Sequence, residues 1–313
     1  MIIVCQQCET KFHLDDNRVS KNRFLVRCTE CNAIFTAYKP VRVQEIRFIE
    51  LDRARSTEPL PRIIAISNQK GGVAKTSTCL NLGMALSLMK KRVLLIDFDV
   101  QANLSISLGY RNQPSFYDAV NAFDTPMSSY ITKTRYTGLY LLPSNKNMVL
   151  LNKKYFGAQN FEYILKDRLG SVVDEYDYIL IDTPPSIEFF TLNALSAAGL
   201  AIIPSQCDYL STHGVDQILR LIKLIRGKTN PGIKARILIT MFDRANVASK
   251  VIYTKLRKMY QGRTFDTAID LDCKVKEAQI MSVPVAHYDG QSTAGRQYSD
   301  LARELIETRS KAA

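Results

Sequence analysis

A turn containing two adjacent glycines and two lysines joins a short apolar run to a helical pattern between residues 63 and 78. The backbone N–H groups of such a turn, with the N-terminus of a helix behind them, form a cradle for an anion. Lys75 stands where its ammonium group can reach the β- and γ-phosphates of a nucleotide, and the hydroxyl of Thr76 can take a Mg²⁺ position. The segment therefore predicts a strand, a phosphate-binding loop and a helix in succession.

The pattern of a short apolar strand followed by a helix recurs along the chain from Arg62 onward. Because apolar runs such as Ile-Ile-Ala-Ile do not alternate with polar residues, both faces of each strand should be buried. The predicted strands are 63–67, 93–97, 139–142, 178–182, 200–204 and 235–240. The predicted helices are 76–90, 187–198, 214–226, 247–260 and 295–308. This repetition predicts an α/β fold with a doubly wound, mostly parallel sheet.

Two of these strands end in carboxylates. Asp97 and Asp99 alternate along an extended chain, so they point to opposite sides and only one of them can face a γ-phosphate. Asp182 follows the apolar run Tyr178-Ile-Leu-Ile, and a strand of this kind can hold Mg²⁺ through a water molecule. The sequence therefore predicts a nucleotide–magnesium site at the strand ends.

The loop departs from the strict pattern G-x-x-x-x-G-K-[ST] at Gln69 and Ala74. It resembles instead the K-G-G-x-G-K-[ST] loop of the ParA/MinD family, deviant Walker A P-loop NTPases of the SIMIBI class, with Ala74 as the single departure. The methyl group of Ala74 is tolerable if the φ angle there is negative, so we expect nucleotide binding to be retained. The segment 97–103 resembles the family's D-x-D-P-Q-G-N, with Val100 and Ala102 replacing proline and glycine. The resemblance extends from Arg62 to about Glu307.

The resemblance implies an ATPase, in which Asp99 orients or deprotonates the attacking water and Asp97 supports either the Mg²⁺ shell or the loop. Lys70 is implied to cross a homodimer interface and touch the phosphates bound to the other subunit. Lys70 and Lys75 join Asp99 as the catalytic residues, and Thr76, Asp99 and Asp182 form the magnesium set. The implied nucleotide-binding residues are Lys70, Gly71, Gly72, Val73, Ala74, Lys75, Thr76, Ser77 and Met241.

The same resemblance implies slow hydrolysis, stimulated by a ParB-like or cargo-adaptor protein, that resets a dimer used in DNA partitioning or cargo positioning. Net charge is +12, and residues 1–61 hold ten Lys or Arg against eight Asp or Glu, so +10 lies in residues 62–313. This excess favours non-specific DNA as a partner. The candidate DNA-binding residues are Arg220, Lys223, Arg226, Arg244 and Lys274. The final residues lack the amphipathic character of a membrane-binding helix, and no secretory segment precedes Cys5, so we expect a cytoplasmic, nucleoid-associated protein.

Four cysteines form two C-x-x-C pairs separated by nineteen residues: Cys5, Cys8, Cys28 and Cys31. Four thiolates suit tetrahedral Zn²⁺, and residues 1–39 resemble the short zinc ribbon at the N-terminus of many bacterial proteins. Rubredoxin-type iron is the alternative, but its knuckles favour glycine where Glu9 and Asn32 stand. Residues 40–61 are predicted to be a linker whose middle is a short helix or strand, and residues 62–313 the ATPase domain. For the ribbon, docking of a protein is the first hypothesis and a DNA contact the second.

Two other functional classes compete with this interpretation. Nitrogenase-iron-protein-like carriers share the K-G-G loop, but they place cluster cysteines at the dimer interface or in a C-terminal C-x-x-C, and neither arrangement occurs in this sequence. A transcription regulator that uses the ribbon on DNA would need a recognition helix, and none is identifiable. The cargo stays undetermined.

Overall fold

The computed structural model describes residues 2–5, 7–15, 19, 23–38, 62–122, 124–208 and 211–310. The chain divides into two compact units, Met1–Asp52 and Arg53–Ala313. The predicted linker at 40–61, with its undecided helix or strand, lies outside the described residues. Within the described ranges, every helix is too short or too polar to cross a bilayer.

The N-terminal unit is built from two hairpins. Strand β1 (Ile2–Val4) pairs antiparallel with β2 (Lys11–His13), and β3 (Arg23–Arg27) pairs antiparallel with β4 (Ile34–Tyr38). The ring of Phe12 meets the ring of Phe35 edge-on, with 6.3 Å between centroids. Beyond this pair the apolar core is small, so the fold of this unit depends on the cysteine site described below.

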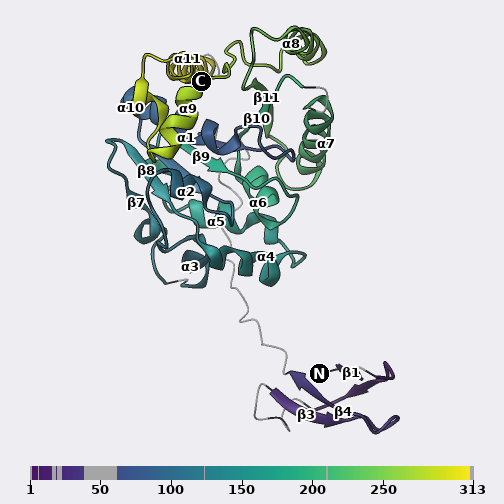
Figure 1. Ribbon diagram of the computed structural model, residues 1–313. Helices are drawn as coiled ribbons and strands as arrows, with labels where there is room; N and C mark the ends of the chain where they lie inside the picture. Colours follow the sequence, from purple (N-terminus) through teal and green to yellow (C-terminus); the bar gives the residue numbers. More distant parts are fainter. Residues whose placement is uncertain are drawn as a thin grey trace. The chain divides into compact units, whose positions relative to one another are not determined.

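The second unit is built on a seven-stranded sheet (Figure 1). Its strands are β5 (Ile63–Ile66), β6 (Val93–Asp97), β7 (Thr132–Lys133), β8 (Leu139–Leu142), β9 (Tyr178–Asp182), β10 (Leu200–Ser205) and β11 (Lys234–Ile239). They lie in the order β11-β10-β5-β9-β6-β8-β7, and all neighbours are parallel except β7 with β8. All six predicted strands are confirmed to within one residue at each end.

Helices cover the sheet. They are α1 (Lys75–Leu88), α2 (Asn103–Ser107), α3 (Phe116–Asn121), α4 (Val149–Tyr155), α5 (Ile164–Leu169), α6 (Phe189–Ala197), α7 (Ser211–Lys228), α8 (Val247–Met259), α9 (Cys273–Ile280), α10 (Val285–Asp289) and α11 (Thr293–Ser310). All residues of β5, β6 and β9 are buried, as expected for strands covered on both faces. Helix α1 lies especially close to β6, because a Cβ on Gly83 would come within 2.5 Å of Leu95 Cδ2.

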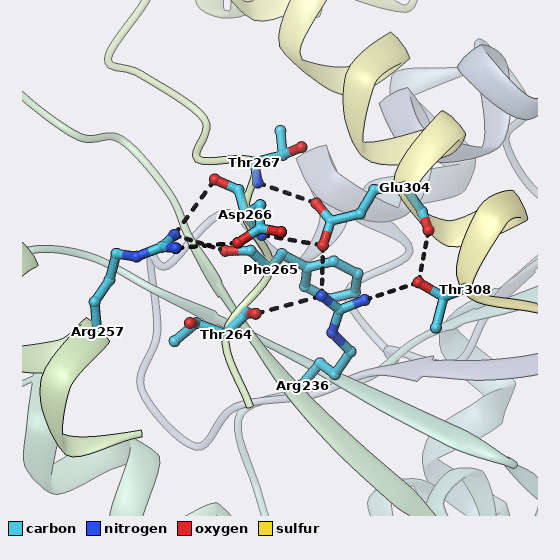
Figure 2. A network of polar contacts seen from close by, with 8 residues as sticks. All are labelled: Arg236, Arg257, Thr264, Phe265, Asp266, Thr267, Glu304 and Thr308. Carbon is cyan, nitrogen blue, oxygen red and sulfur yellow. Dashed lines mark hydrogen bonds and ion pairs between the residues drawn. The ribbon is translucent and has the colours of Figure 1, made fainter. Parts of the chain in front are cut away.

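A polar network fastens the C-terminal helix to the edge of the sheet (Figure 2). The guanidinium of Arg236 on β11 forms an ion pair with Glu304 on α11 and lies 3.8 Å from the ring centre of Phe265. The Glu304 carboxylate also accepts hydrogen bonds from the backbone N–H groups of Asp266 and Thr267, each at 3.0 Å. The network therefore joins β11, α11 and the segment that runs beside β11.

Candidate functional site

The loop between β5 and α1 is held in place by residues at the ends of β10 and β11. The side-chain amide of Gln206, just after β10, donates to the carbonyl of Gly72 at 2.8 Å. The hydroxyl of Thr240, just after β11, donates to the carbonyl of Val73 at 3.1 Å. Asn68 at the start of the loop donates to the carbonyl of Pro204 at 2.8 Å. These contacts leave Gly71 and Gly72 exposed, where a nucleotide can approach their backbone.

Ala74 adopts a left-handed backbone with a φ angle of 65°. The expectation that its methyl group is tolerated assumed a negative φ angle, and that assumption is wrong. Ala102, at the family's glycine position after β6, is also left-handed with φ 54°. A left-handed alanine costs roughly 1–2 kcal/mol because its Cβ crowds the following carbonyl oxygen. The phosphate loop and the loop after β6 each keep the backbone of the glycine-containing form, and each carries strain at its alanine.

Ala74→Gly is expected to stabilise the protein by about 0.5–1 kcal/mol, because relief of the strain exceeds the added chain entropy of glycine in the unfolded state. Thermal unfolding should show a rise of about 1–4 °C in the midpoint. Ala85→Gly, in the middle of α1, is the matched control and should lower the midpoint. A lower midpoint for Ala74→Gly than for wild type would show that the strain assignment is wrong.

Lys75 lies inside the loop, next to the acidic strand ends. Its Nζ donates to the carbonyl of Lys70 at 3.0 Å, and its side chain is buried. Burial lowers the pKa of the Lys75 ammonium, and the nearby carboxylates of Asp182 and Asp99 act against that shift. On α1, the Ser77 hydroxyl accepts a hydrogen bond of 2.9 Å from the side-chain amide of Gln279 on α9. The ammonium group of Lys75 therefore lies between the phosphate loop and the acidic strand ends.

Asp97 is bonded to the segment that follows β6. One oxygen of its fully buried carboxylate accepts from the backbone N–H and hydroxyl of Ser105, at 2.8 and 2.7 Å. The other accepts from the backbone N–H of Asp99 at 3.3 Å. Burial raises the pKa of Asp97 to about 6. These bonds assign Asp97 to supporting the loop after β6.

The carboxylates of Asp99 and Asp182 accept fewer hydrogen bonds from the described residues than the carboxylate of Asp97 does. Asp99 is 8% exposed, and one of its oxygens accepts from the backbone N–H of Gln101 at 3.0 Å. Both oxygens of Asp182 are buried, and among the described residues neither has a hydrogen-bond partner in good geometry. The pKa of Asp182 lies well above its usual range because of burial and the neighbouring Asp97, while Thr76 and Lys75 act in the opposite direction.

A buried carboxylate with unsatisfied oxygens fits a site beside a divalent cation. Asp182 and the adjoining Thr76 are the residues that would hold Mg²⁺ here, directly or through its water shell. When bound, Mg²⁺ neutralises charge on the β- and γ-phosphates. The second carboxylate oxygen of Asp99 accepts no hydrogen bond from the described residues. Asp99 is therefore the carboxylate that is able to orient a water molecule.

Lys70 is held outside the cradle that Lys75 fills. Its Nζ forms an ion pair with the carboxylate of Asp208 and donates to the Ser211 hydroxyl at 3.3 Å. The side chains of Lys70 and Asp208 are 26% and 42% exposed, so solvent reaches the pair. Met241 lies near the loop, because the Gln206 amide that binds Gly72 also contacts the Met241 sulfur at 3.6 Å.

The five candidate DNA-binding residues have different surroundings. Arg220 and Lys223 are exposed on the outer face of α7, where Leu224, Gly227 and Lys228 lie beside them on an open surface. Three others are engaged within the fold. These are Arg226, whose Nε donates to the carbonyl of Ile233 at 2.7 Å, Arg244, whose Nε donates to Asp270 at 2.6 Å, and Lys274, which pairs with Glu277 at 2.8 Å. Arg220 and Lys223 are therefore the clearest candidates.

The four N-terminal thiols converge, with all four sulfur atoms within 4.8 Å of one another. The two knuckles have matching backbones, since the N–H of Cys5 donates to Thr10 and that of Cys28 to Ala33, at 2.9 and 2.8 Å. Glu9 and Asn32 have φ angles of 58° and 60°, the conformation that glycine usually supplies. Their side chains therefore do not exclude iron, and the choice of metal rests on the thiol set and the family match below.

The purified protein is expected to hold about one zinc ion per chain, because a Cys₄ site binds Zn²⁺ tetrahedrally. Elemental analysis measures this directly, and iron in place of zinc would contradict it. Cys28→Ser should remove the zinc and unfold the N-terminal unit, while Cys273→Ser, at an exposed thiol outside the cluster, should change neither. ATP binding should survive both substitutions, because the phosphate loop lies in the other unit.

Comparison with known proteins agrees with this site. Residues 61–235 match the family described as an AAA domain, and residues 1–36 match a zinc-ribbon domain. The chromosome partitioning protein ParA of Caulobacter vibrioides (strain NA1000 / CB15N) is 35% identical over 257 residues, which cover 80% of this chain and 96% of that protein. The sporulation initiation inhibitor protein Soj of Bacillus subtilis (strain 168) is 34% identical, with coverage of 78% and 98%.

A solved structure also shares the fold and shows the ligands. Cobyrinic acid a,c-diamide synthase from Mycobacterium smegmatis, crystallised with ADP and magnesium, superimposes with a TM-score of 0.69 at 30% identity, covering 81% of this chain and 97% of that one. The deviant phosphate loop, the acidic strand ends and the four-thiol cluster agree with these matches. The chain therefore belongs to the ParA family of P-loop ATPases, with ATP, Mg²⁺ and, in its N-terminal zinc ribbon, Zn²⁺ as its cofactors.

Proposed function

We propose that this protein is an ATP-driven switch in DNA partitioning or in positioning a cargo on DNA. Two copies dimerise around ATP, and the dimer binds DNA of any sequence. Slow hydrolysis, stimulated by a ParB-like or cargo-adaptor protein, returns the chains to monomers. In a cell such a protein associates with the nucleoid in the cytoplasm. The relatives named for chromosome partitioning and the basic excess of the ATPase region support this function.

The observation that carries the proposal is that the two lysines of the loop have different partners and positions. Lys75 already occupies the chain's own phosphate cradle, whereas Lys70 rests on Asp208 at the rim. A solvent-exposed ion pair contributes only about 0–1 kcal/mol, so Lys70 can exchange Asp208 for a stronger anion at little cost. A compact ammonium suits a point contact with a triphosphate. The phosphates of a second copy provide that anion, which makes ATP part of the dimer interface.

Hydrolysis then acts as the release step. Loss of the γ-phosphate removes the group that Lys70 of the other copy would touch, and Lys70 returns to Asp208. The two states differ in one charged contact at the loop, which is enough to bias an association equilibrium. A protein partner that orders Asp99 and its water would shorten the lifetime of the dimer.

DNA binding is expected to depend on ATP. A monomer presents one basic α7 surface and a dimer presents two, so the number of phosphate contacts and the salt slope of binding should roughly double. The measurement is a salt titration of a fluorescent duplex with ATP or ADP. We expect binding with ATP, much weaker binding with ADP, and no preference for sequence. Equal affinity in the two nucleotides would contradict the link between ATP and DNA.

The α7 contribution is tested by the pair Arg220→Glu and Lys223→Glu. Binding should be lost at moderate salt while basal ATP turnover stays at the wild-type rate, because both side chains are exposed on α7 and neither belongs to the nucleotide-binding set. The matched control is Lys133→Glu with Lys153→Glu, two exposed lysines on β7 and α4. Equal loss in the control would mean that only net charge matters.

A redox carrier is the functional alternative. Among the described residues, the ribbon thiols form the single group of three or more Cys, His, Asp or Glu side chains close enough together to hold a metal. Cys79 and Cys207 of the ATPase unit are buried, and Cys273 is exposed. An anaerobically purified Cys28→Ser sample that still shows visible charge-transfer absorbance would favour the carrier and overturn the switch, because the ribbon metal is absent from that variant.

A further inference from the structure

Helix α8 presents a second basic surface, separate from the residues assigned to DNA above. Ser249 and Leu256 face inward and are buried. At 100° per residue, Lys250, Lys255 and Lys258 lie within an arc of about 140° on the opposite side, and all three are exposed. The helix contains no Asp or Glu. Its outer face therefore carries three like charges without a carboxylate between them.

These lysines are available to a partner. Among the described residues, none of the three forms an ion pair. Arg257, at the edge of the buried side, is already engaged, since it donates to the carbonyl of Phe265 and to the carboxylate of Asp266, each at 3.1 Å (Figure 2). Arg257 therefore contributes to the fold, whereas the three lysines face solvent.

The end of α8 is bonded to α7. The hydroxyl of Tyr260, directly after α8, donates to the carboxylate of Asp216 on α7 at 2.6 Å. Asp216 lies one turn before Arg220 and on the same side of the helix as Lys223. Both helices lie at the end of the sheet formed by β10 and β11 (Figure 1). The end of α8 therefore meets α7 one turn before Arg220.

We propose that α7 and α8 together bind the phosphate backbone of one DNA duplex, with Lys250, Lys255 and Lys258 as contacts additional to those of α7. The proposal rests on the DNA binding proposed above and extends its surface. From Lys250 to Lys258 the helix rises about 12 Å, a length over which duplex DNA carries about seven phosphate charges. Charge complementarity and the contact between α8 and the basic helix α7 both favour a polyanion here.

The test is a triple substitution, Lys250→Gln, Lys255→Gln and Lys258→Gln, in the full chain with ATP. Each lysine that meets a phosphate should contribute about 0.9 to the slope of log K against log salt, so the slope should fall by about 2–3 and affinity should drop at least about tenfold at moderate salt. The matched control is Lys133→Gln, Lys153→Gln and Lys166→Gln, which are exposed elsewhere. Basal ATP turnover should be unchanged in both triples.

The outcomes separate the two proposals. If wild-type protein with ATP does not bind the duplex, the proposed function fails. If wild type binds and the α7 pair weakens it, but the α8 triple matches the control triple, the α8 surface is wrong and the proposed function stands. Val247 and Val251 are 74% and 63% exposed among the lysines, so vesicles of phosphatidylglycerol and phosphatidylcholine form a third arm. Vesicle binding that depends on the three lysines, with DNA binding unchanged, would overturn the inference in favour of a lipid surface.

Discussion

Asp99→Ala is expected to slow ATP hydrolysis by at least about 100-fold, which is the usual loss when a water-orienting general base is removed. ATP binding should be retained, because the loop contacts from Gln206 and Thr240 and the ammonium of Lys75 do not involve the Asp99 side chain. Among the described residues, the hydrogen bond that its carboxylate accepts comes from its own turn, at Gln101. Loss of the side chain therefore removes chemistry more than structure.

Single-turnover measurements with radiolabelled ATP give the chemical step directly. Asp174→Ala, at a carboxylate whose side chain is 88% exposed, is the control for removal of a charge and should hydrolyse at the wild-type rate. Asp97→Asn should behave differently from Asp99→Ala, since it perturbs the bonds to Ser105 and so lowers thermal stability. If Asp99→Ala turns over at the wild-type rate, the roles given to the two aspartates are wrong.

Lys75→Ala is expected to weaken nucleotide binding by at least about 100-fold, because charge-assisted contacts to phosphate are lost in a buried site. The substitution also leaves Asp182 and Asp99 without the cation that lies between them and the loop. Titration of the protein with a fluorescent ATP analogue and Mg²⁺ measures the affinity. The wild-type value in Lys75→Ala would show that the lysine does not reach the phosphates.

Lys70→Ala is the informative companion to that variant. Its ammonium lies on Asp208 and Ser211, outside the cradle, so a single chain should keep its affinity for ATP. The two lysines stand five residues apart in one loop, and the same substitution at each should affect different properties. A loss of ATP affinity in Lys70→Ala as large as that in Lys75→Ala would mean that both lysines serve the same nucleotide.

The main strands of the ATPase unit follow from the sequence because strands buried on both faces read as unbroken apolar runs. The short elements do not. Strand β7 has two residues, and α2, α3, α5 and α10 have five or six, too few for a periodic pattern to stand out. Their positions are set by tertiary contacts, such as the bond from Ser105 to Asp97 that fixes α2 beneath the strand end.

In the candidate site, too, some features can be predicted from the sequence and others depend on tertiary contacts. The residues that carry charge can be identified by type and spacing, but the residues that hold the loop cannot. Gln206, Thr240 and Gln279 lie far from the loop in the sequence, and each reaches it only because parallel strands and α9 converge there. A polar residue after a strand is visible in the sequence, whereas the carbonyl it will bind is not.

Surface charge is the hardest property to interpret from sequence alone. The helical pattern places Arg226 beside Arg220 and Lys223, yet Arg226 bonds to the carbonyl of Ile233. Arg244 bonds to Asp270, a partner 26 residues away. The backbone conformation of Ala74 is also hard to predict from the sequence. The sign of its φ angle depends on how the loop is anchored and not on the residue itself.

The most direct test of ATP as the joining element is the mass of the protein in solution, measured by light scattering on a sizing column. The Asp99→Ala background is used so that ATP persists during the run. With ATP and Mg²⁺ the mass should be about twice that of the 35.4 kDa chain, and with ADP it should be that of one chain. Lys70→Ala in the same background should stay at one chain in ATP. A single-chain mass for Asp99→Ala in saturating ATP, or a dimer of equal strength in ADP, would contradict the account.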